Sequence, residues 1–378
     1  MKALILTMTS GDGHNIISRT IARHLDARGA ESKIVDIYRS RKFSHWFNSV
    51  GYIIANKYFR PVYRRIYRIS KYRPSEKRWK GGVVSFLRPI EADILSEIAS
   101  YRPDFVLAPH PYTAALVSLF KHEKKIPSSL PVYGILTDLF PHAYWETAVD
   151  CDKIFVPSLC CAEEMAWKGI PRENLAEVGF PVNDRFFERR QTSEARQALG
   201  LGDCFTVLLS SGGFGTANNF KIVKQLLKSD LPLQILNMNS RNKRGKKRVD
   251  RLIRRKKLTN VKNFGYVEDV ALLMEASDVI VCKGGCSTLF EAMAVGLPIV
   301  VRECIINNEV ENADYLQSLG ICLRMSRPAD ARRFVERLAN DPALAADMRA
   351  KSLAFARPGC VEKMLDDVGV PARKFPAE

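Results

Sequence analysis

Short runs of β-branched and other apolar residues alternate with segments of helical periodicity along nearly the whole chain. This alternation constrains the fold more than any other feature, because strand, helix and strand in succession are typical of parallel βαβ units. The runs expected to form buried strands are residues 3–7, 33–37, 105–108, 132–136 and 153–156 in the first half, and residues 206–210, 233–237, 261–264, 278–282 and 299–302 in the second. The pattern predicts an α/β chain with two doubly wound, Rossmann-like sheets.

The chain of 378 residues is long enough for two domains with separate cores. Residues 179–183, Gly-Phe-Pro-Val-Asn, end a strand pattern and precede the charged stretch 185–196. We place the linker there, which predicts domains at residues 1–184 and 185–378. Ligands of doubly wound sheets bind beyond the carboxyl ends of the strands. Two such domains are therefore expected to face each other across a cleft, with a hinge at the linker.

The charge balance indicates an anionic partner. The chain holds 58 Lys and Arg residues against 41 Asp and Glu residues, a formal net charge of +17, which suits nucleic acid or the anionic face of a membrane. No stretch approaches the roughly 18 uninterrupted apolar residues of a membrane span, so we expect any membrane contact to be peripheral. The nine cysteines show no CxxC motif and no zinc-ligand spacing. We interpret them as reduced thiols of a cytosolic protein, and we expect no metal site.

Residues 41–90 interrupt the βαβ rhythm with 13 basic residues, one acid and 11 aromatic residues, among them Trp46. Such a composition is typical of a membrane interface. Tyr63 and its apolar neighbours fall at helical spacing, as expected of a helix lying on anionic lipid. The basic residues around them are Arg60, Arg64, Arg65 and Arg68. A core-facing helix with a solvated basic face, or a site that stacks single-stranded bases, would fit the same pattern.

A second basic cluster, residues 241–257, holds 11 basic residues, one acid and no aromatic residue. For this cluster the pattern favours a solvated helix face.

A glycine-rich turn follows the first expected strand, with Gly11, Gly13 and His14 ahead of an apolar-periodic helix. Gly residues permit a tight turn from strand to helix, which places His14 at the carboxyl end of the sheet. A neutral imidazole there could take a proton from a substrate hydroxyl. A capping or packing histidine would give the same motif. The turn lacks GxGxxG, so it does not indicate a dinucleotide site.

Two further glycine-rich loops follow strands in the second half, and both resemble anion cradles. Residues 210–215 include Gly212 and Gly213, while residues 283–288 include Gly284, Gly285, Ser287 and Thr288 at the start of a helix. Glycines, hydroxyls and a helix N-terminus can bind a diphosphate without a metal. Glu291, one turn further on, is placed to accept both hydroxyls of a ribose, or it is a favourable charge near a helix N-terminus. Neither loop has the GK[ST] ending of a Walker A motif, so ATP hydrolysis is not expected.

The order of these motifs resembles the family of monogalactosyldiacylglycerol synthases and processive diacylglycerol glucosyltransferases, over roughly residues 2–365. The motifs that carry the resemblance are Gly-x-Gly-His, Thr137-Asp138 with His142 and Trp145, Gly179-x-Pro181, Gly212-Gly213, Gly265-Tyr266, Lys283-Gly284-Gly285, Glu291-Ala292, Gly296-Leu297-Pro298, and Glu309 with Asn312. These enzymes have the GT-B fold, two Rossmann-like domains facing across a cleft, with the nucleotide sugar held by the second.

The resemblance implies roles for individual residues. The donor residues it implies are Gly212, Gly213, Gly284, Gly285, Ser287 and Thr288 at the diphosphate, Glu291 at the ribose, Tyr266 and Val267 at the uracil, and Asn308 and Glu309 at the sugar. His14 is implied as the base at the acceptor hydroxyl, with Asp138 as the reserve candidate or the orienting carboxylate. Gly13 and His110 belong to the acceptor side, and the basic, aromatic segment occupies the place where the family grips the membrane and its lipid.

Two departures from the family pattern bear on specificity. Residues 307–309 read Asn-Asn-Glu where relatives usually carry Gly-Gln-Glu, and the shorter amide of Asn308 leaves glucose, galactose or another hexose open. The loop after Thr137 also reaches His142 and Trp145 one residue sooner than in the plant members.

The resulting hypothesis is an inverting transferase that moves a hexose from a UDP-sugar to diacylglycerol or a glycosyldiacylglycerol. It would act in the cytoplasm, peripherally on the inner face of the cell membrane, with anionic lipids as partners and without a cofactor. The alternatives are transfer of GlcNAc or another sugar to a different lipid-linked acceptor, and a basic nucleic-acid-binding protein. The second is disfavoured because it would leave the glycine loops and Glu291 without a purpose.

Overall fold

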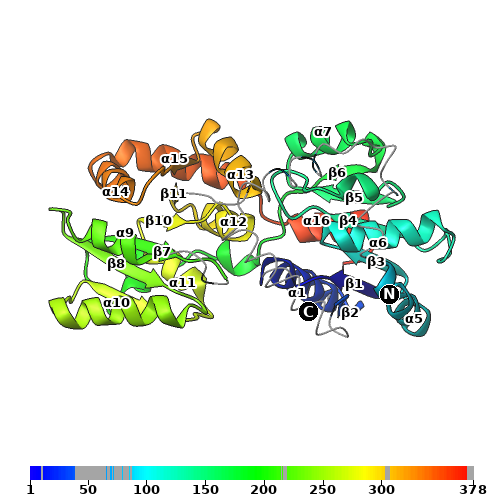
Figure 1. Ribbon diagram of the computed structural model, residues 1–378, viewed down its shortest axis with the longest axis horizontal. Helices are drawn as coiled ribbons and strands as arrows, with labels where there is room; N and C mark the ends of the chain where they lie inside the picture. The colour runs from blue at the N-terminus through cyan, green and yellow to red at the C-terminus, as the bar shows by residue number, and fades with distance from the viewer. Residues whose placement is uncertain are drawn as a thin grey trace, which may run out of the picture. The chain divides into compact units, whose positions relative to one another are not determined.

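The computed structural model describes residues 1–9, 12–38, 65, 69, 71, 79, 85, 87–213, 215, 219–302 and 307–372. Within these residues the chain forms two units, Met1–Pro181 together with Gly359–Glu378, and Val182–Pro358 (Figure 1). The predicted boundary at residue 184 lies within three residues of the observed one. The C-terminal segment differs from the prediction, because it belongs to the first unit.

The first unit is built on a six-stranded parallel sheet of order β2-β1-β3-β4-β5-β6. Its strands are β1 (Lys2–Thr7), β2 (Glu31–Asp36), β3 (Phe105–Ala108), β4 (Val132–Ile135), β5 (Lys153–Val156) and β6 (Leu175–Glu177). Its helices are α1 (Asp12–Ala27), η2 (Arg88–Ile90), α5 (Glu91–Tyr101), α6 (Pro111–His122), η3 (Trp145–Thr147), α7 (Leu159–Trp167), η4 (Arg172–Asn174) and α16 (Cys360–Asp367). Strands β3 and β5 match the predicted bounds, whereas the three-residue β6 was not among the predicted strands.

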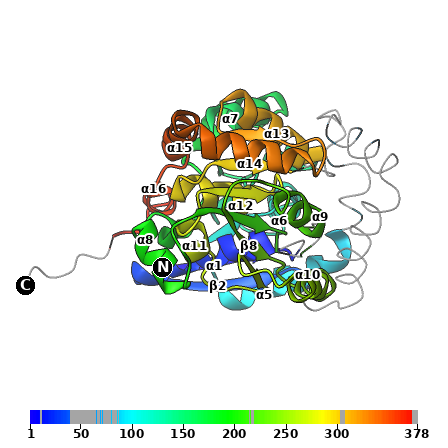
Figure 2. The same cartoon turned by 90° about the vertical axis from the view of Figure 1, so that its left-hand side faces the viewer.

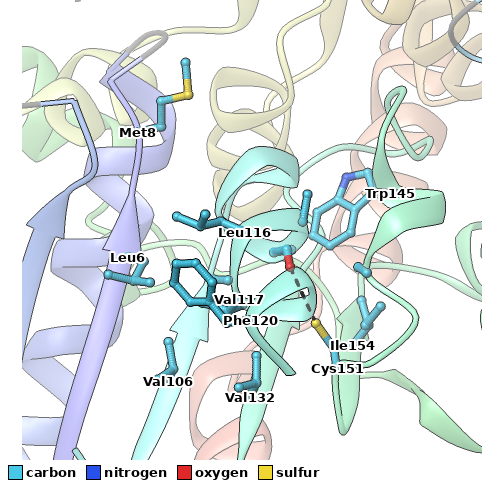
Figure 3. Packing of buried hydrophobic residues seen from close by; sticks show 14 of the residues in the cluster. Leu6, Met8, Val106, Leu116, Val117, Phe120, Val132, Trp145, Cys151 and Ile154 are labelled. Atoms are coloured by element: carbon cyan, nitrogen blue, oxygen red, sulfur yellow. Dashed lines mark hydrogen bonds between the residues drawn. The ribbon is translucent and has the colours of Figure 1, made fainter. Parts of the chain in front are cut away.

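The core of the first unit explains why its strands are continuous apolar runs. Helices cover both faces of a parallel sheet, so its central strands are buried on both sides. Figure 3 shows Leu6, Val106, Val132 and Ile154 of four neighbouring strands packed with Phe120 of α6. The Trp145 ring closes one end of this cluster and is 1% exposed. A Cβ atom at Gly134 in β4 would lie 3.1 Å from that ring and 3.2 Å from Ile154, so a larger residue there would have to displace these two buried side chains.

The second unit has a six-stranded parallel sheet of order β12-β11-β10-β7-β8-β9, the Rossmann arrangement. Its strands are β7 (Phe205–Ser210), β8 (Leu233–Met238), β9 (Val261–Phe264), β10 (Val279–Cys282), β11 (Ile299–Val301) and β12 (Cys322–Arg324). Its helices are η5 (Asp184–Phe186), α8 (Thr192–Ala198), α9 (Asn219–Leu226), α10 (Lys243–Lys256), α11 (Val270–Glu275), α12 (Cys286–Val295), α13 (Asn307–Ser318), α14 (Asp330–Asn340) and α15 (Pro342–Phe355). The short strand β12 was also absent from the prediction.

Helix α16 returns the chain to the first unit, where it contacts α1 (Figure 1). The side chain of Arg28, the residue after α1, is 6% exposed and bonds Glu362 and Asp366 of α16, the latter at 2.6 Å. Its Nη1 atom also donates to the Val370 carbonyl at 2.7 Å. Four apolar or thiol side chains of α16 are buried: Cys360, Val361, Met364 and Leu365. The first unit is therefore completed by the last helix of the described chain.

Candidate active site

The sheet of the first unit reverses its strand order between β1 and β3, and a ligand crevice forms at such a point. His14 lies in the first turn of α1, directly after Gly13 and the loop that leaves β1. His110, 5% exposed, follows β3 and caps the N-terminus of α6 through the Tyr112 amide. The two imidazole rings meet edge to face with their centroids 4.5 Å apart. The structure therefore brings together the two histidines that the sequence assigned to the acceptor side.

The orientation of the His14 ring leaves one nitrogen open. Its Nδ1 atom lies 2.9 Å from the Pro109 carbonyl oxygen and 3.1 Å from Thr137 Oγ1. A carbonyl oxygen can only accept, so Nδ1 carries the hydrogen and Nε2 keeps its lone pair. Asn15 fixes the preceding loop by bonding Thr7 at 3.2 Å and Thr9 at 2.9 Å. His14 is thus held as a neutral imidazole whose Nε2 can accept a proton.

Burial lowers the pKa of His14 to about 4, although its bond to Pro109 acts in the opposite direction. The nearby His142 contributes a smaller lowering of the same pKa. Burial also lowers the pKa values of His110 and His142. All three imidazoles are therefore neutral near pH 7, which is the form a general base requires.

Asp138 follows β4 and is half-buried, one residue after Thr137. It is not the group that orients His14, because Nδ1 of that ring bonds Pro109 and Thr137. The Pro109 carbonyl could not be predicted from the sequence, because every residue has a backbone carbonyl and residue type does not show which one accepts a hydrogen bond. Asp138 as the reserve base stays a prediction.

An aromatic series extends from His110 along the same edge of the sheet. The Tyr112 ring lies 5.3 Å from His110 and 5.3 Å from Tyr144. Tyr144 has φ +80°, a left-handed conformation that costs energy for a bulky residue. The sequence analysis missed both tyrosines, and the aromatic at residue 144, between His142 and Trp145, is the signal that could have indicated one of them.

Most of the predicted membrane segment falls outside the described residues, including Trp46, Arg60, Tyr63, Arg64 and Arg68. Arg65 is described and exposed. Membrane contact by this segment stays a prediction.

The sheet of the second unit reverses between β7 and β10, and both predicted glycine loops follow these two strands. Gly212 has φ +72°, a conformation that glycine adopts without cost. A Cβ atom on it would lie 3.3 Å from Cε of Lys283, so the loop after β10 touches the loop after β7. Gly213 accepts a hydrogen bond from Ser240 Oγ at 2.5 Å. The structure therefore brings the two loops together at the ligand-binding edge of this sheet.

Gly285 is the N-cap of α12 and has no conformational need to be glycine. Its φ of −80° suits any residue, and a Cβ atom there would meet nothing within 4 Å. The space beside it lies at the N-terminus of a ten-residue helix, where unpaired N–H groups favour an anion. Gly284, Ser287 and Thr288 belong to the same turn. This open space at a helix N-terminus is suited to a phosphate.

Glu291 lies one turn further along α12 and is half-buried. Burial raises the pKa of its carboxyl group to about 8. Within the described ranges, no hydrogen bond or ion pair engages this carboxylate. A partly desolvated carboxylate without a protein donor is available to a ligand that supplies donors, as the hydroxyls of a ribose would.

Glu309 and Asn308 begin α13, close to the same loop. Glu309 is 7% exposed and its Oε1 lies 2.6 Å from Lys283 Nζ. Asn312 donates to the Gly284 carbonyl at 3.0 Å, which fixes the loop against α13. The buried Oδ1 of Asn308 has no partner among the residues that the structure describes. Sequence reasoning missed the Lys283–Glu309 pair, because the two charges lie 26 residues apart and only the fold joins them.

Tyr266 and Val267 follow β9 at the same edge of the second sheet. Tyr266 is 65% exposed and Val267 is half-buried. Across the described part of the chain no group of three or more His, Cys, Asp or Glu residues could hold a metal ion. The described helices also include none that is long and apolar enough to cross a membrane.

Solved structures share this architecture. The MurG protein of Acinetobacter baumannii superposes with a TM-score of 0.65 at 13% identity, over 97% of this chain and 99% of that one. Anabaena Alr3699/HepE in complex with UDP gives a TM-score of 0.59 at 14% identity, over 98% of this chain and 100% of that one. The chain therefore has the GT-B fold, with two Rossmann-like domains.

Sequence comparisons match both units of the chain. The family model for monogalactosyldiacylglycerol (MGDG) synthase matches residues 14–182, and the glycosyltransferase family 28 C-terminal domain matches residues 214–343. The processive diacylglycerol beta-glucosyltransferase of Bacillus cytotoxicus is 24% identical over 97% of this chain and 92% of its own length. That of Bacillus cereus strain B4264 is 26% identical over 90% and 86%. Both units of this chain are therefore similar to the monogalactosyldiacylglycerol synthases and processive diacylglycerol glucosyltransferases.

Proposed function

We propose that this protein transfers a hexose from a UDP-sugar to the hydroxyl of diacylglycerol, or of a glycosyldiacylglycerol, with inversion at the anomeric carbon. The observation that carries the donor half is the loop after β10, where the open space beside Gly285 lies one turn before the unpartnered Glu291. A diphosphate and a ribose are chemically complementary to these two features. The lipid acceptor is supported by the named activity of the relatives.

In this proposal His14 is the general base. Its Nε2 atom takes the proton of the acceptor hydroxyl as the oxygen attacks the anomeric carbon, while the Pro109 carbonyl holds the ring through Nδ1. The neutral imidazole that burial favours is the form able to accept a proton. Asp138 is the reserve candidate for the same role.

The departing UDP gains negative charge as the glycosidic bond breaks. The N-terminus of α12 and the Lys283 ammonium, in contact with the Gly212 loop, are placed to stabilise that charge. No step of this mechanism needs a cofactor, with the UDP-sugar acting as a co-substrate.

The donor hexose is glucose or galactose. The relatives named above act as glucosyltransferases, whereas the matched N-terminal family is named for galactose. Asn308 and Glu309 replace the usual Gln-Glu pair at the sugar, and the unpartnered Oδ1 of Asn308 is available to a sugar hydroxyl. The cytoplasmic location, peripheral on the inner membrane face, and the partnership with anionic lipids belong to this proposal as well.

A panel assay tests the proposal. The purified protein is incubated in neutral detergent micelles with UDP-glucose, UDP-galactose or UDP-GlcNAc, and with diacylglycerol or monoglucosyldiacylglycerol. We expect transfer from one of the first two donors to diacylglycerol, with a β-linked product from the α-linked donor by NMR. Transfer only from UDP-GlcNAc, or only to another lipid-linked acceptor, would replace this assignment.

A further inference from the structure

Helix α10 exposes a face made only of basic residues. Its opposite side is apolar, with Val249 and Leu252 buried in the core of the second unit. At 3.6 residues per turn, seven consecutive positions around the outward arc are exposed, and each is Lys or Arg. These residues are Lys243, Arg244, Lys247, Arg248, Arg251, Arg254 and Arg255.

One acid of the helix acts on this arc, and only at its edge, where Arg254 helps to lower the pKa of Asp250. Asp250 is the one acidic residue of α10, and it lies beside the arc, bonded to Lys246 at 3.0 Å and to Asn263 at 2.6 Å. Within the described residues, none of the seven arc residues forms an ion pair. Apart from the effect of Asp250 on Arg254, the positive charge of this face is therefore uncompensated within the described structure.

Helix stability does not account for such a face. On α14 and α15 of the same unit, exposed basic residues pair with acids four positions away, as in Arg332–Glu336 at 3.7 Å and Lys351–Asp347 at 2.6 Å. On α10 the corresponding pairs, such as Lys247 with Arg251, carry like charges and destabilise the helix. The basic residues in its first turn also oppose the helix dipole. An anionic partner would offset both costs.

The basic face continues onto α9, the neighbouring helix. Right-handed crossovers place both helices on one side of the sheet, and they are in contact (Figure 2). The Phe220 ring of α9 lies under Arg248 at 4.5 Å and Lys224 at 6.0 Å, so residues of the two helices adjoin. Lys224 therefore adds to the same surface, and Lys221 of α9 and Lys228, two residues after that helix, are also exposed. We name these three residues and the seven of α10 the α9–α10 basic surface.

We propose that the α9–α10 basic surface docks the donor-binding unit onto anionic phospholipid headgroups. The inference rests on the proposed function, because a lipid acceptor requires the enzyme to work at a bilayer surface. A lipid surface suits this face better than single-stranded nucleic acid, since residues 241–257 carry no aromatic side chain on which bases could stack, and the Phe220 ring of α9 already lies beneath Arg248 and Lys224. Attachment here is electrostatic and adds to any contact made by residues 41–90.

A charge-reversal variant tests the proposal in the full-length protein. Lys247→Glu, Arg251→Glu and Arg255→Glu are combined, and partitioning onto vesicles of equal parts phosphatidylcholine and phosphatidylglycerol is measured by sedimentation. Each basic residue near an anionic surface contributes about fivefold to binding, so we expect roughly 100-fold weaker partitioning. The matched control combines Arg333→Glu, Arg337→Glu and Lys351→Glu, which makes the same change in net charge elsewhere on the unit and should shift partitioning far less.

The outcomes separate this inference from the proposed function. The α10 variant should keep native UDP affinity and native transfer in neutral detergent micelles, which also shows that it folds. Native partitioning of that variant, or equal losses in variant and control, would overturn the docking surface and leave the transferase assignment intact. Tight binding of single-stranded RNA at physiological salt, lost only in the α10 variant while vesicle binding persists, would reassign the surface to nucleic acid. Failure of the native protein in the micelle assay would refute the transferase itself.

Discussion

His14 shows how a single residue acquires a role from its surroundings. The glycine-rich turn predicted that this histidine lies at the carboxyl end of the first sheet, and the structure places it there. Its tautomer could not be predicted, because the Pro109 carbonyl that sets it lies 95 residues away in the chain. Glu291 is the corresponding case in the second unit, since the burial that raises its pKa depends on how the whole sheet is covered.

We expect His14→Ala to lower kcat by roughly 100-fold or more, since a general base contributes about 10² to 10⁴. UDP affinity should persist, because the residue lies in the other unit. His122→Ala, at an exposed end of α6, is the matched control. In the native enzyme the acid limb of kcat/KM for the lipid acceptor, measured at saturating UDP-sugar, should fall near pH 4, where His14 becomes protonated, and not near 6.5. A near-normal kcat in the variant would transfer the role to Asp138.

Glu291→Ala should weaken UDP binding by about 1.5 to 3 kcal/mol in calorimetry, the range for hydrogen bonds to a charged group. Glu194→Ala on α8 serves as the exposed control. The pKa of about 8 adds a pH dependence with a definite sign. Below pH 8 the free carboxyl group is protonated, so binding to the ribose as a carboxylate releases a proton. Native UDP affinity should therefore rise from pH 6 to 8, and unaltered affinity in the alanine variant would contradict the assignment.

At the scale of elements, most of the fold was predictable from the chain. Inner strands such as β3 and β5 are largely apolar runs because both faces of the sheet are covered, and their predicted bounds match. Strands β6 and β12 have only three residues each and lie at sheet edges, where burial is partial. Their residues therefore carry little periodic signal, and backbone pairing with a neighbour decides their conformation.

At the loop before α12, the effect of a substitution on stability can be separated from its effect on UDP binding. Gly285→Ala should leave the midpoint of unfolding unchanged, because φ is −80° and the new methyl group meets nothing within 4 Å. UDP affinity should nevertheless fall by about tenfold or more, since the methyl group would occupy the space assigned to the diphosphate, and even 1.4 kcal/mol is a factor of ten. Gly202→Ala, also free of close contacts, is the control. Unchanged UDP affinity by calorimetry would place the diphosphate elsewhere.

The segment of residues 41–90 is tested by replacing Arg60, Arg64, Arg65 and Arg68 with Glu. Binding to phosphatidylglycerol vesicles should weaken by several kcal/mol, at about 1 kcal/mol for each basic residue near the surface. Added salt should weaken native binding as well, although the aromatic contribution should persist. Sedimentation measures both effects, and tryptophan fluorescence of the first unit is the control for folding. If the substituted protein binds vesicles as tightly as the native protein, residues 41–90 do not contribute to membrane binding.

At the scale of the whole molecule, the sequence indicated two domains and the boundary between them. It did not indicate that the C-terminal helix α16 packs on the first unit. The spacing of apolar residues in α16 is that of any amphipathic helix, and it does not indicate which unit the helix packs against. The determinant is a long-range contact between Arg28 and residues 334 or more positions later. Sequence spacing cannot show such a contact, so all residues after 184 were assigned to the second domain.

Arg28→Met should lower the free energy of unfolding of the first unit by about 1.5 to 3 kcal/mol, because charged hydrogen bonds to Glu362 and Asp366 are lost. All four tryptophans lie between residues 46 and 167, so tryptophan fluorescence follows this unit alone. Arg19→Met, at an exposed position of α1, is the control. UDP affinity should stay native in both variants. An unchanged fluorescence midpoint for Arg28→Met would show that α16 is dispensable to the first unit.

The return of α16 also sets an order on synthesis. The ribosome completes residues 1–181 first, but the helix that finishes this unit emerges only after residues 182–358. At about 5 to 20 residues per second, that delay is roughly 10 to 35 s. During this time the surface of α1 that α16 will cover is open on the nascent chain. The first unit is therefore the last to be completed. A chaperone that shields apolar surface has this whole interval in which to bind the uncovered side of α1.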